Sequence, residues 1–289
     1  MQAWEKALQL LPEPLRSAAS REAIQSAEEI RLRLGQAPTI LYAGEETVLH
    51  PAPVTSGPLE RVVEKASGAS LHAVIEAMRE GYLSCGGLRI GLCGVAARSG
   101  EGMEGFRHIT SLAIRIPRER PGLCKSWYAA LYPEGFQNTL LLSPPGGGKT
   151  TALRDLIREL SERGWRVAVA DERNELSASG EAGLGFRLGS HCDVLAGLPK
   201  AEASVLLLRA MNPQILAMDE VGSDEEVQLL HKLSCSGVGI LASCHAAGVQ
   251  ELAAHPILGG LWESGVFTQA LVIRREGAAR RYTVERRAP

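Results

Sequence analysis

Aromatic side chains are scarce in this 289-residue sequence, where Phe, Trp and Tyr together make up 4% of the chain. Proteins that bind single-stranded nucleic acid stack its bases on aromatic rings, so this scarcity counts against that class. A large excess of charge is also absent, because 31 Lys and Arg residues are matched by 33 Asp and Glu residues. The resulting net charge of −2 gives no bulk attraction to nucleic acid or to an anionic membrane.

Cys-x-x-Cys pairs and long apolar runs are missing as well. The six cysteines are dispersed, which gives no support for a zinc site or a thioredoxin-type motif. Cys235 and Cys244 lie near apolar runs, and we expect both to be buried. No apolar run approaches the ~20 residues that a membrane-spanning helix needs. Glu5 and Lys6 interrupt the first residues, so we expect no signal peptide and a soluble protein in a reducing, cytoplasmic setting.

A glycine-rich turn stands between an apolar run and a segment with helical spacing of leucines. Residues 140–142 are three leucines, residues 143–151 read Ser-Pro-Pro-Gly-Gly-Gly-Lys-Thr-Thr, and residues 152–160 continue as an amphipathic segment. This order predicts a strand, a turn and a helix, which is the setting of a phosphate-binding loop. Small residues let backbone N–H groups point inward at polyphosphate, and the helix N-terminus adds its positive dipole end.

The loop pattern assigns a role to each of its residues. Lys149 is expected to reach the β- and γ-phosphates of a nucleotide, and the Thr150 hydroxyl is expected to ligate Mg²⁺. Ser143 replaces the first glycine of the usual Gly-x-x-x-x-Gly-Lys-Ser/Thr pattern; it opens the turn, and we do not expect it to touch phosphate. The residues expected to contact the nucleotide are Pro145, Gly146, Gly147, Gly148, Lys149, Thr150 and Thr151.

Two carboxylates follow the apolar run at residues 214–218, which predicts a buried strand with Asp219 and Glu220 at its carboxyl end. Ligands of open α/β sheets bind at that end of the strands. We expect Asp219 to hold Mg²⁺, directly or through water, and Glu220 to orient or deprotonate an attacking water as a catalytic residue. The alternative is a strand that ends in two solvated acids.

A third apolar run, residues 167–170, ends in Asp171 and Glu172. These carboxylates either support a metal ion or water, or belong to a solvated turn. Arg173 either contacts phosphate or pairs with Glu175.

A fourth run, residues 238–242, ends in polar residues. Ser243 or His245 is expected to sense the γ-phosphate by hydrogen bonding, although a single histidine is more often structural. Arg209 is placed either at a subunit contact or at a solvated helix end. The arginines after residue 273 are expected to form a solvated terminal hairpin.

Strands and helices divide the chain into two predicted domains. Residues 1–120 read as a smaller α+β domain, residues 121–136 as a linker, and residues 137–289 as an α/β domain with a parallel sheet. In the first domain the sequence predicts an interrupted helix within 1–20, helices at 59–67 and 70–80, and strands at 30–34, 39–42, 46–50, 82–85, 88–95 and 109–116. In the second it predicts strands at 138–143, 165–171, 214–219, 238–243, 268–275 and 281–285.

Together these motifs resemble the stage III sporulation protein AA family, whose members are similar to the ATPases of type II secretion and type IV pilus systems. The resemblance covers most of the chain, and its most specific pieces are residues 29–33, 87–94, 143–151, 171–173 and 218–220. It implies a RecA-like P-loop ATPase core behind a smaller N-terminal domain. It also implies ATP and Mg²⁺ as cofactors and assembly into a homo-hexamer.

The resemblance further implies a cytoplasmic motor, peripheral at the membrane on the mother-cell side of a channel to the forespore, with inner-membrane proteins of that channel as partners. Asp171 and Glu172 resemble the acidic box of secretion ATPases, and residues 243–245 resemble their histidine box imperfectly. Such motors take a trans-acting arginine from the N-terminal part. The candidates here are Arg89, Arg107 and Arg115.

Three functions compete at this point. The first is an oligomeric Mg²⁺-dependent ATPase that drives a membrane complex. The second is a nucleic-acid-dependent ATPase of the RecA-like group, which the near-neutral charge and few aromatics disfavour. The third is a scaffold that binds ATP without appreciable hydrolysis.

Overall fold

The structure, a computed structural model, describes residues 3–19, 24–25, 27–42, 45–68, 75, 81–99, 102–117, 119–179, 185–277 and 279–287. The chain divides into two compact units, Met1–Arg118 and Glu119–Pro289. Each unit has its own sheet and its own hydrophobic core. No helix in the described ranges has the length and apolar character to cross a membrane.

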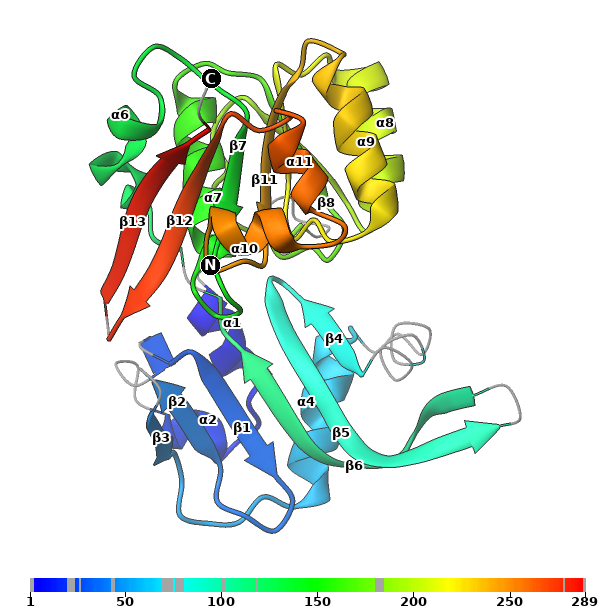
Figure 1. The fold of residues 1–289 in the computed structure, drawn as a ribbon. Helices are drawn as coiled ribbons and strands as arrows, with labels where there is room; N and C mark the ends of the chain where they lie inside the picture. Colours follow the sequence, from blue (N-terminus) through cyan, green and yellow to red (C-terminus); the bar gives the residue numbers. More distant parts are fainter. Residues whose placement is uncertain are drawn as a thin grey trace. The chain divides into compact units, whose positions relative to one another are not determined.

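Unit 1 is built on a six-stranded antiparallel sheet with the strand order β3-β2-β1-β6-β5-β4 (Figure 1). Its strands are Glu29–Arg33 (β1), Thr39–Tyr42 (β2), Glu45–Val48 (β3), Tyr82–Cys85 (β4), Leu88–Ser99 (β5) and Gly102–Arg115 (β6). Its helices are Ala3–Leu10 (α1), Leu15–Ala18 (α2) and Ser56–Ala66 (α4), and α4 contacts β6 and β4.

The sequence pattern accounts for most of unit 1. Alternation in β1 buries Ile30 and Leu32 completely, as the sequence predicts. The predicted hairpin between residues 85 and 88 is present, whereas β6 begins seven residues before the predicted strand. Of the helix predicted at 70–80, only residue 75 lies within the described residues.

Unit 2 is a seven-stranded sheet with the order β13-β12-β7-β11-β10-β8-β9, parallel except for the terminal β12–β13 hairpin. The strands are Thr139–Leu142 (β7), Val167–Asp171 (β8), Cys192–Ala196 (β9), Ile215–Met218 (β10), Gly239–Cys244 (β11), Gln269–Glu276 (β12) and Ala279–Arg286 (β13). The helical segments are Leu123–Ser126 (η1, a 3₁₀ helix), Tyr128–Leu131 (α6), Lys149–Glu162 (α7), Lys200–Met211 (α8), Asp224–Ser234 (α9), Val249–Ala254 (α10) and Gly259–Glu263 (α11).

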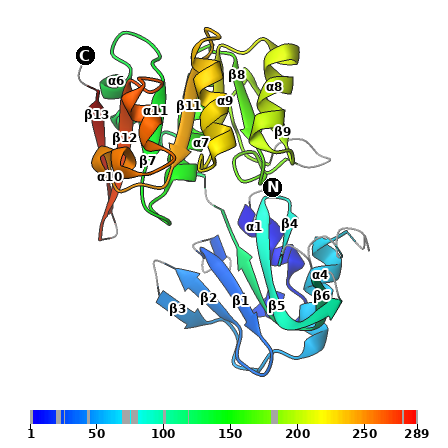
Figure 2. The same cartoon turned by 45° about the vertical axis from the view of Figure 1, so that its right-hand side comes forward.

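Helices cover both faces of this sheet, because successive residues of a strand point to opposite faces. Leu140 and Leu142 of β7 belong to the core under α8, α9, α10 and α11, whereas Leu141 belongs to the core under α7 and α6. Helices α8 and α9 lie side by side over the sheet (Figure 2). Burial on both faces explains why these strands are continuous apolar runs rather than alternating ones.

The sequence does not predict strand β9, and its prediction for Cys235 is wrong. Residues 192–196 form the outer strand of the sheet and are only half-buried, so their sequence lacks the apolar run that marks the central strands. Cys244 is buried as predicted, but Cys235 is exposed because it follows the last turn of α9.

Residues 119–136 are part of unit 2 in the structure. Cys124, Trp127 and Leu131 are buried in the core beneath α7. The carboxylate of Asp155, on α7, accepts hydrogen bonds from the backbone N–H groups of Gly122 (2.9 Å) and Cys124 (2.8 Å). Whether residues 121–136 act as a linker between domains in solution stays a prediction.

Burial acts to raise the pKa of Asp155, but the hydrogen bonds from Cys124, Gly122 and Arg158 outweigh it, so its pKa lies below the ordinary value. A carboxyl group with a lowered pKa in the folded state stabilises the fold above its unfolded pKa of about 3.9, and that stabilisation is lost as the pH falls through the folded pKa.

We expect Asp155→Asn to lower the free energy of unfolding of unit 2 by about 2–3 kcal/mol at pH 7, because the charged acceptor of a buried and a half-buried N–H group is lost. Urea unfolding followed by tryptophan fluorescence measures this, since Trp127, Trp165 and Trp262 lie in unit 2. Glu162→Gln, on an exposed residue of the same helix, is the matched control and should be nearly neutral. The difference between Asp155→Asn and the wild type should shrink below about pH 4; a difference that does not change with pH would contradict the role of the carboxylate.

Candidate functional site

The glycine loop joins β7 to α7 as predicted, and α7 begins at Lys149. Gly146 and Gly148 have φ angles of +72° and +101°, a region that residues with side chains rarely adopt. A Cβ on Gly147 would lie 1.6 Å from the Ser143 hydroxyl oxygen. The serine in place of the first motif glycine is therefore buried beneath the loop, and it leaves room only for glycine at position 147.

Lys149 is buried within the loop, with 4% of its surface exposed. Its Nζ donates to the Ser143 carbonyl oxygen (3.0 Å) and lies 2.8 Å from His245 Nδ1. Burial lowers the pKa of Lys149, and the nearby carboxylates of Asp219 and Glu220 oppose that shift. The loop lysine and the acidic strand end therefore share one site, although β11 lies between their strands in the sheet.

Asp219 is held by hydroxyl groups from two neighbouring elements. Ser243, at the end of β11, donates to Asp219 Oδ1, which also accepts the N–H of Glu220 at 3.0 Å. Burial raises the pKa of Asp219, while hydrogen bonds from Ser243 and Thr150 and the charge of Lys149 act against it. Ser243 thus orients the Asp219 carboxylate, and His245 faces the loop lysine. Which of the two senses the γ-phosphate stays a prediction.

Glu220 lies at a strained turn, with a φ angle of +50°. Its Oε2 accepts a hydrogen bond from Arg173 Nη1 (2.6 Å), and its Oε1 lies 3.2 Å from His245 Nε2. Left-handed backbone at a residue with a side chain costs about 1–3 kcal/mol and concentrates at functional sites. Arg173 forms an ion pair with Glu220, a partner that the sequence does not indicate.

His245 connects the lysine to the glutamate. The Lys149 ammonium group can only donate, so His245 Nδ1 accepts from it and the proton of a neutral imidazole sits on Nε2. That Nε2–H then donates to Glu220 Oε1. A single line of side chains runs from Lys149 through His245 and Glu220 to Arg173.

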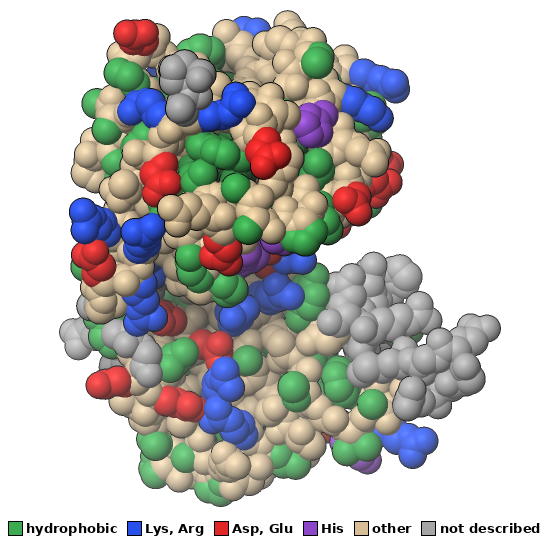
Figure 3. All heavy atoms as spheres, in the orientation of Figure 1, with side chains coloured by type: hydrophobic (Ala, Val, Ile, Leu, Met, Phe, Trp, Pro, Cys, Tyr) green, Lys and Arg blue, Asp and Glu red, His purple; other side chains and the backbone are tan. Residues whose placement is uncertain are grey.

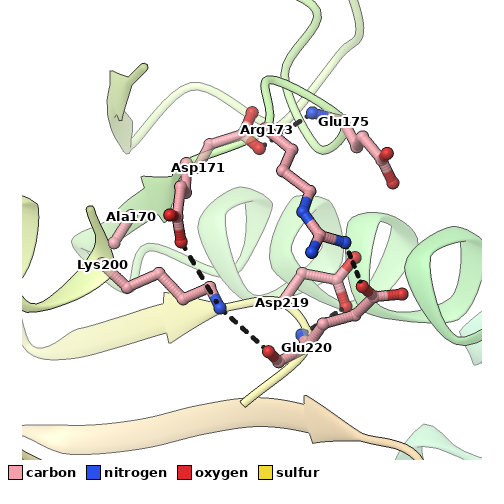
Figure 4. Close-up of a pocket in the computed structure, with 8 residues that line it drawn as sticks. Ala170, Asp171, Arg173, Glu175, Lys200, Asp219 and Glu220 are labelled. Atoms are coloured by element: carbon pink, nitrogen blue, oxygen red, sulfur yellow. Dashed lines mark hydrogen bonds and ion pairs between the residues drawn. The ribbon is translucent and has the colours of Figure 1, made fainter. Parts of the chain in front are cut away.

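A small pocket opens beside Glu220 at the carboxyl ends of β8 and β10 (Figure 4). Lys200 reaches across it from the first turn of α8, and its Nζ donates to the Glu220 carbonyl oxygen at 2.9 Å. The same ammonium lies 3.6 Å from the Glu172 carboxylate, whose side chain is 40% exposed. Nothing in the sequence singled out Lys200 as a member of the site, because its role depends on the placement of α8.

Asp171 does not face this pocket with a free carboxylate. Oδ1 accepts the N–H groups of Glu175 and Leu176, and Oδ2 accepts both the N–H and the hydroxyl of Ser177, all at 2.7–3.1 Å. A carboxylate has about four acceptor positions, and all four are occupied here. These contacts favour an anchor for the 173–179 turn over a metal ligand, which is the first of the two alternatives that the sequence leaves open.

The remaining predicted residues are more dispersed. Pro145 is exposed, and Thr151 lines a second pocket together with Arg154 and Arg158. Arg89, Arg107 and Arg115 all lie on β5 or β6 of unit 1. Arg209 is exposed in the last turn of α8. The trans-acting and subunit-contact roles of these arginines stay predictions.

A family model described as sporulation stage III, protein AA, matches residues 1–284. The chain belongs to this family. Stage III sporulation protein AA of Bacillus subtilis (strain 168) is 31% identical over 277 residues, which cover 92% of this chain and 90% of that protein. The uncharacterized protein ycf45 of Cyanidium caldarium is 30% identical over 159 residues, 53% of this chain and 46% of that protein.

Two solved structures resemble this member of the stage III sporulation protein AA family along most of its length. The Legionella pneumophila ATPase DotB gives a TM-score of 0.60 at 15% identity and covers 99% of this chain and 80% of its own. The pilus retraction motor PilT, solved with bound ADP, gives a TM-score of 0.66 at 16% identity. The match covers 96% of this chain and 83% of the PilT chain. The likeness confirms the predicted fold, a RecA-like P-loop core behind an α+β region.

Steric contact between Ser143 and Gly147 can be tested by a double-mutant cycle. We expect Gly147→Ala to lower the free energy of unfolding by about 1–3 kcal/mol, because the added methyl group meets the Ser143 hydroxyl. In the background of Ser143→Gly the same change should be milder, and urea unfolding measures both. The control cycle uses Gly146→Ala, whose added Cβ would have no atom within 4 Å. Equal coupling in the two cycles would contradict the steric account.

Proposed function

We propose that this protein is a Mg²⁺-dependent ATPase that hydrolyses ATP to ADP and phosphate. The observation that carries the proposal is the hydrogen-bonded line from Lys149 through His245 to Glu220, beside Asp219. A lysine in a glycine loop matches a triphosphate, and a carboxylate at the neighbouring strand end matches an attacking water. The PilT structure of similar fold was solved with bound ADP, which supports a nucleotide as the ligand.

The oxygen donors at the site suit Mg²⁺. The Thr150 hydroxyl and the Asp219 carboxylate contact each other at the mouth of the loop. Mg²⁺ prefers such hard oxygen ligands and commonly takes one or two protein groups, with phosphates and waters completing its shell. When bound, it neutralises charge on the β- and γ-phosphates. Ser243 holds Asp219 in position for this role.

The protein side chains have separate tasks in this account. Backbone N–H groups of residues 146–149 and the α7 N-terminus bind the phosphates, and the Lys149 ammonium leaves the Ser143 carbonyl for the γ-phosphate. Glu220 accepts a proton from the attacking water. His245 donates from Nε2 to Glu220 before nucleotide arrives and is free to donate to the γ-phosphate afterwards.

Glu220 must leave Arg173 before it can accept a proton from water, because the Arg173 guanidinium occupies its Oε2. The 2.6 Å contact to Arg173 Nη1 therefore belongs to a resting state. In this proposal, nucleotide binding rearranges the Glu220 turn, whose φ of +50° is a strained conformation.

Membership of a sporulation family supports a biological setting for this ATPase. We place it as a homo-hexamer on the cytoplasmic, mother-cell side of a channel to the forespore, peripheral at the membrane and in contact with inner-membrane channel proteins. The similarity to DotB and PilT supports a motor that converts hydrolysis into domain movement. In a hexamer, one of Arg89, Arg107 and Arg115 would reach a neighbour's nucleotide.

We expect Glu220→Gln to bind ATP normally and to lose turnover by about 100-fold or more, as removal of a general base does. Lys149→Ala should instead weaken ATP binding by about tenfold or more, because a charge-assisted contact to phosphate is lost. Phosphate release and calorimetric titration with ATP and Mg²⁺ separate the two effects.

Two substitutions at exposed residues of α9 serve as controls: Glu225→Gln matches Glu220→Gln, and Lys232→Ala matches Lys149→Ala. Wild-type turnover in Glu220→Gln would remove Glu220 from the mechanism. ATP binding without phosphate release, even in the assembled protein, would favour the scaffold, and stimulation by DNA or RNA would favour the nucleic-acid-dependent ATPase.

A further inference from the structure

An arginine from the terminal hairpin reaches the phosphate loop. Basic side chains gather over the β12–β13 hairpin (Figure 3), which the sequence predicts to be a solvated element. Arg280, near the start of β13, departs from that expectation, because its Nε donates to the Gly147 carbonyl oxygen at 2.8 Å. The same Nε lies 2.7 Å from the position that a Cβ on Gly148 would occupy. The side chain therefore lies directly against the Gly147–Gly148 peptide.

This contact fixes the direction of one peptide group in the loop. Among the described residues only the Glu13–Pro14 bond is cis, so the Gly147–Gly148 peptide is trans. In a trans peptide the C=O and the N–H point in opposite directions. With the Gly147 carbonyl oxygen held by Arg280, the Gly148 N–H must point away from the hairpin. Glycines on both sides of this peptide would otherwise allow it to rotate.

Rigid elements hold Arg280 in place. Strand β12 pairs in parallel with β7, the strand that leads into the loop, from Gln269 opposite Thr139 to Val272 opposite Leu142. Strand β13 is fixed in turn by Tyr282, whose ring stacks on Trp127 with the centroids 5.5 Å apart. The sheet therefore fixes the position of the Arg280 guanidinium relative to the loop that it contacts.

The positive charge of Arg280 is also available to a ligand. Within the described part of the chain, no carboxylate forms an ion pair with it, whereas its neighbour Arg281 lies 3.6 Å from Glu276 and Arg275 donates to Gly277. A guanidinium remains charged at any physiological pH. The loop therefore carries a second cation besides Lys149, on the side of the hairpin.

We propose that Arg280 is a positioning residue for the phosphates of the bound nucleotide: it holds the Gly147 carbonyl oxygen outward so that the Gly148 N–H is aimed at a phosphate oxygen. The proposal rests on the proposed function and deepens it, since it makes the terminal hairpin part of the nucleotide site. It concerns the phosphates and not the base, so ADP and pyrophosphate should depend on Arg280 while adenosine should not.

The test compares Arg280→Ala, Arg280→Lys and the matched control Arg281→Ala in the full chain, by calorimetric titration with Mg²⁺ and ADP, and with pyrophosphate. We expect Arg280→Ala to weaken both by about tenfold, as the loss of one charge-assisted hydrogen bond does. Arg280→Lys keeps a charged donor and should recover most of the affinity. Arg281→Ala should bind like the wild type.

Melting of the nucleotide-free proteins separates positioning from a structural role. We expect Arg280→Ala and Arg281→Ala to melt within about a degree or two of each other, as exposed or half-buried surface changes do. ADP affinity of Arg280→Ala equal to that of the wild type overturns the inference and leaves the proposed function intact. A loss that Arg280→Lys does not recover, with a matching fall in melting temperature, overturns it in favour of a structural role. Failure of the wild type to bind ADP overturns the proposed function and this inference together.

Discussion

A buried lysine that forms no ion pair with a carboxylate of the described residues is the constraint on which the rest of this site depends. Lys149 is almost completely enclosed, and its direct partners are a carbonyl oxygen and an imidazole nitrogen, both uncharged. Burial of a cation is unfavourable unless hydrogen bonds or opposite charge offset it. An anion beside the lysine would stabilise such a site. Burial lowers the pKa of Lys149, and a triphosphate would bring several negative charges next to its ammonium group.

The order of strands in unit 2 brings the parts of this site together. Strand β11 lies between the loop strand and the acidic strand, so Ser243 and His245 separate Lys149 from Asp219 and Glu220 and bond to both sides. Strand β12 flanks the loop strand on its other side and brings the terminal hairpin to the glycines. A nucleotide bound at the loop would therefore affect both the Glu220 turn and the β12–β13 hairpin.

Local pattern was sufficient to predict the central sheet and the loop, because buried parallel strands are apolar runs and a glycine loop has a recognisable sequence. It could not predict contacts that depend on where distant elements pack. The hydrogen bonds of Arg173, Lys200 and Arg280 join residues 20 to 133 positions apart, and nothing local indicates them. For Asp171 the sequence leaves a metal ligand and a turn residue as alternatives, and only the folded turn shows that neighbouring N–H groups occupy its carboxylate.

The central claim is that Lys149 is the phosphate-binding group of a site that it shares with Asp219. A crystal structure of the protein with Mg²⁺ and a non-hydrolysable ATP analogue tests it most directly. The account predicts Lys149 Nζ on the γ-phosphate, no longer on the Ser143 carbonyl oxygen, with the metal ion between Thr150 and Asp219. A nucleotide bound elsewhere, with Lys149 still joined to Ser143 and His245, would contradict it.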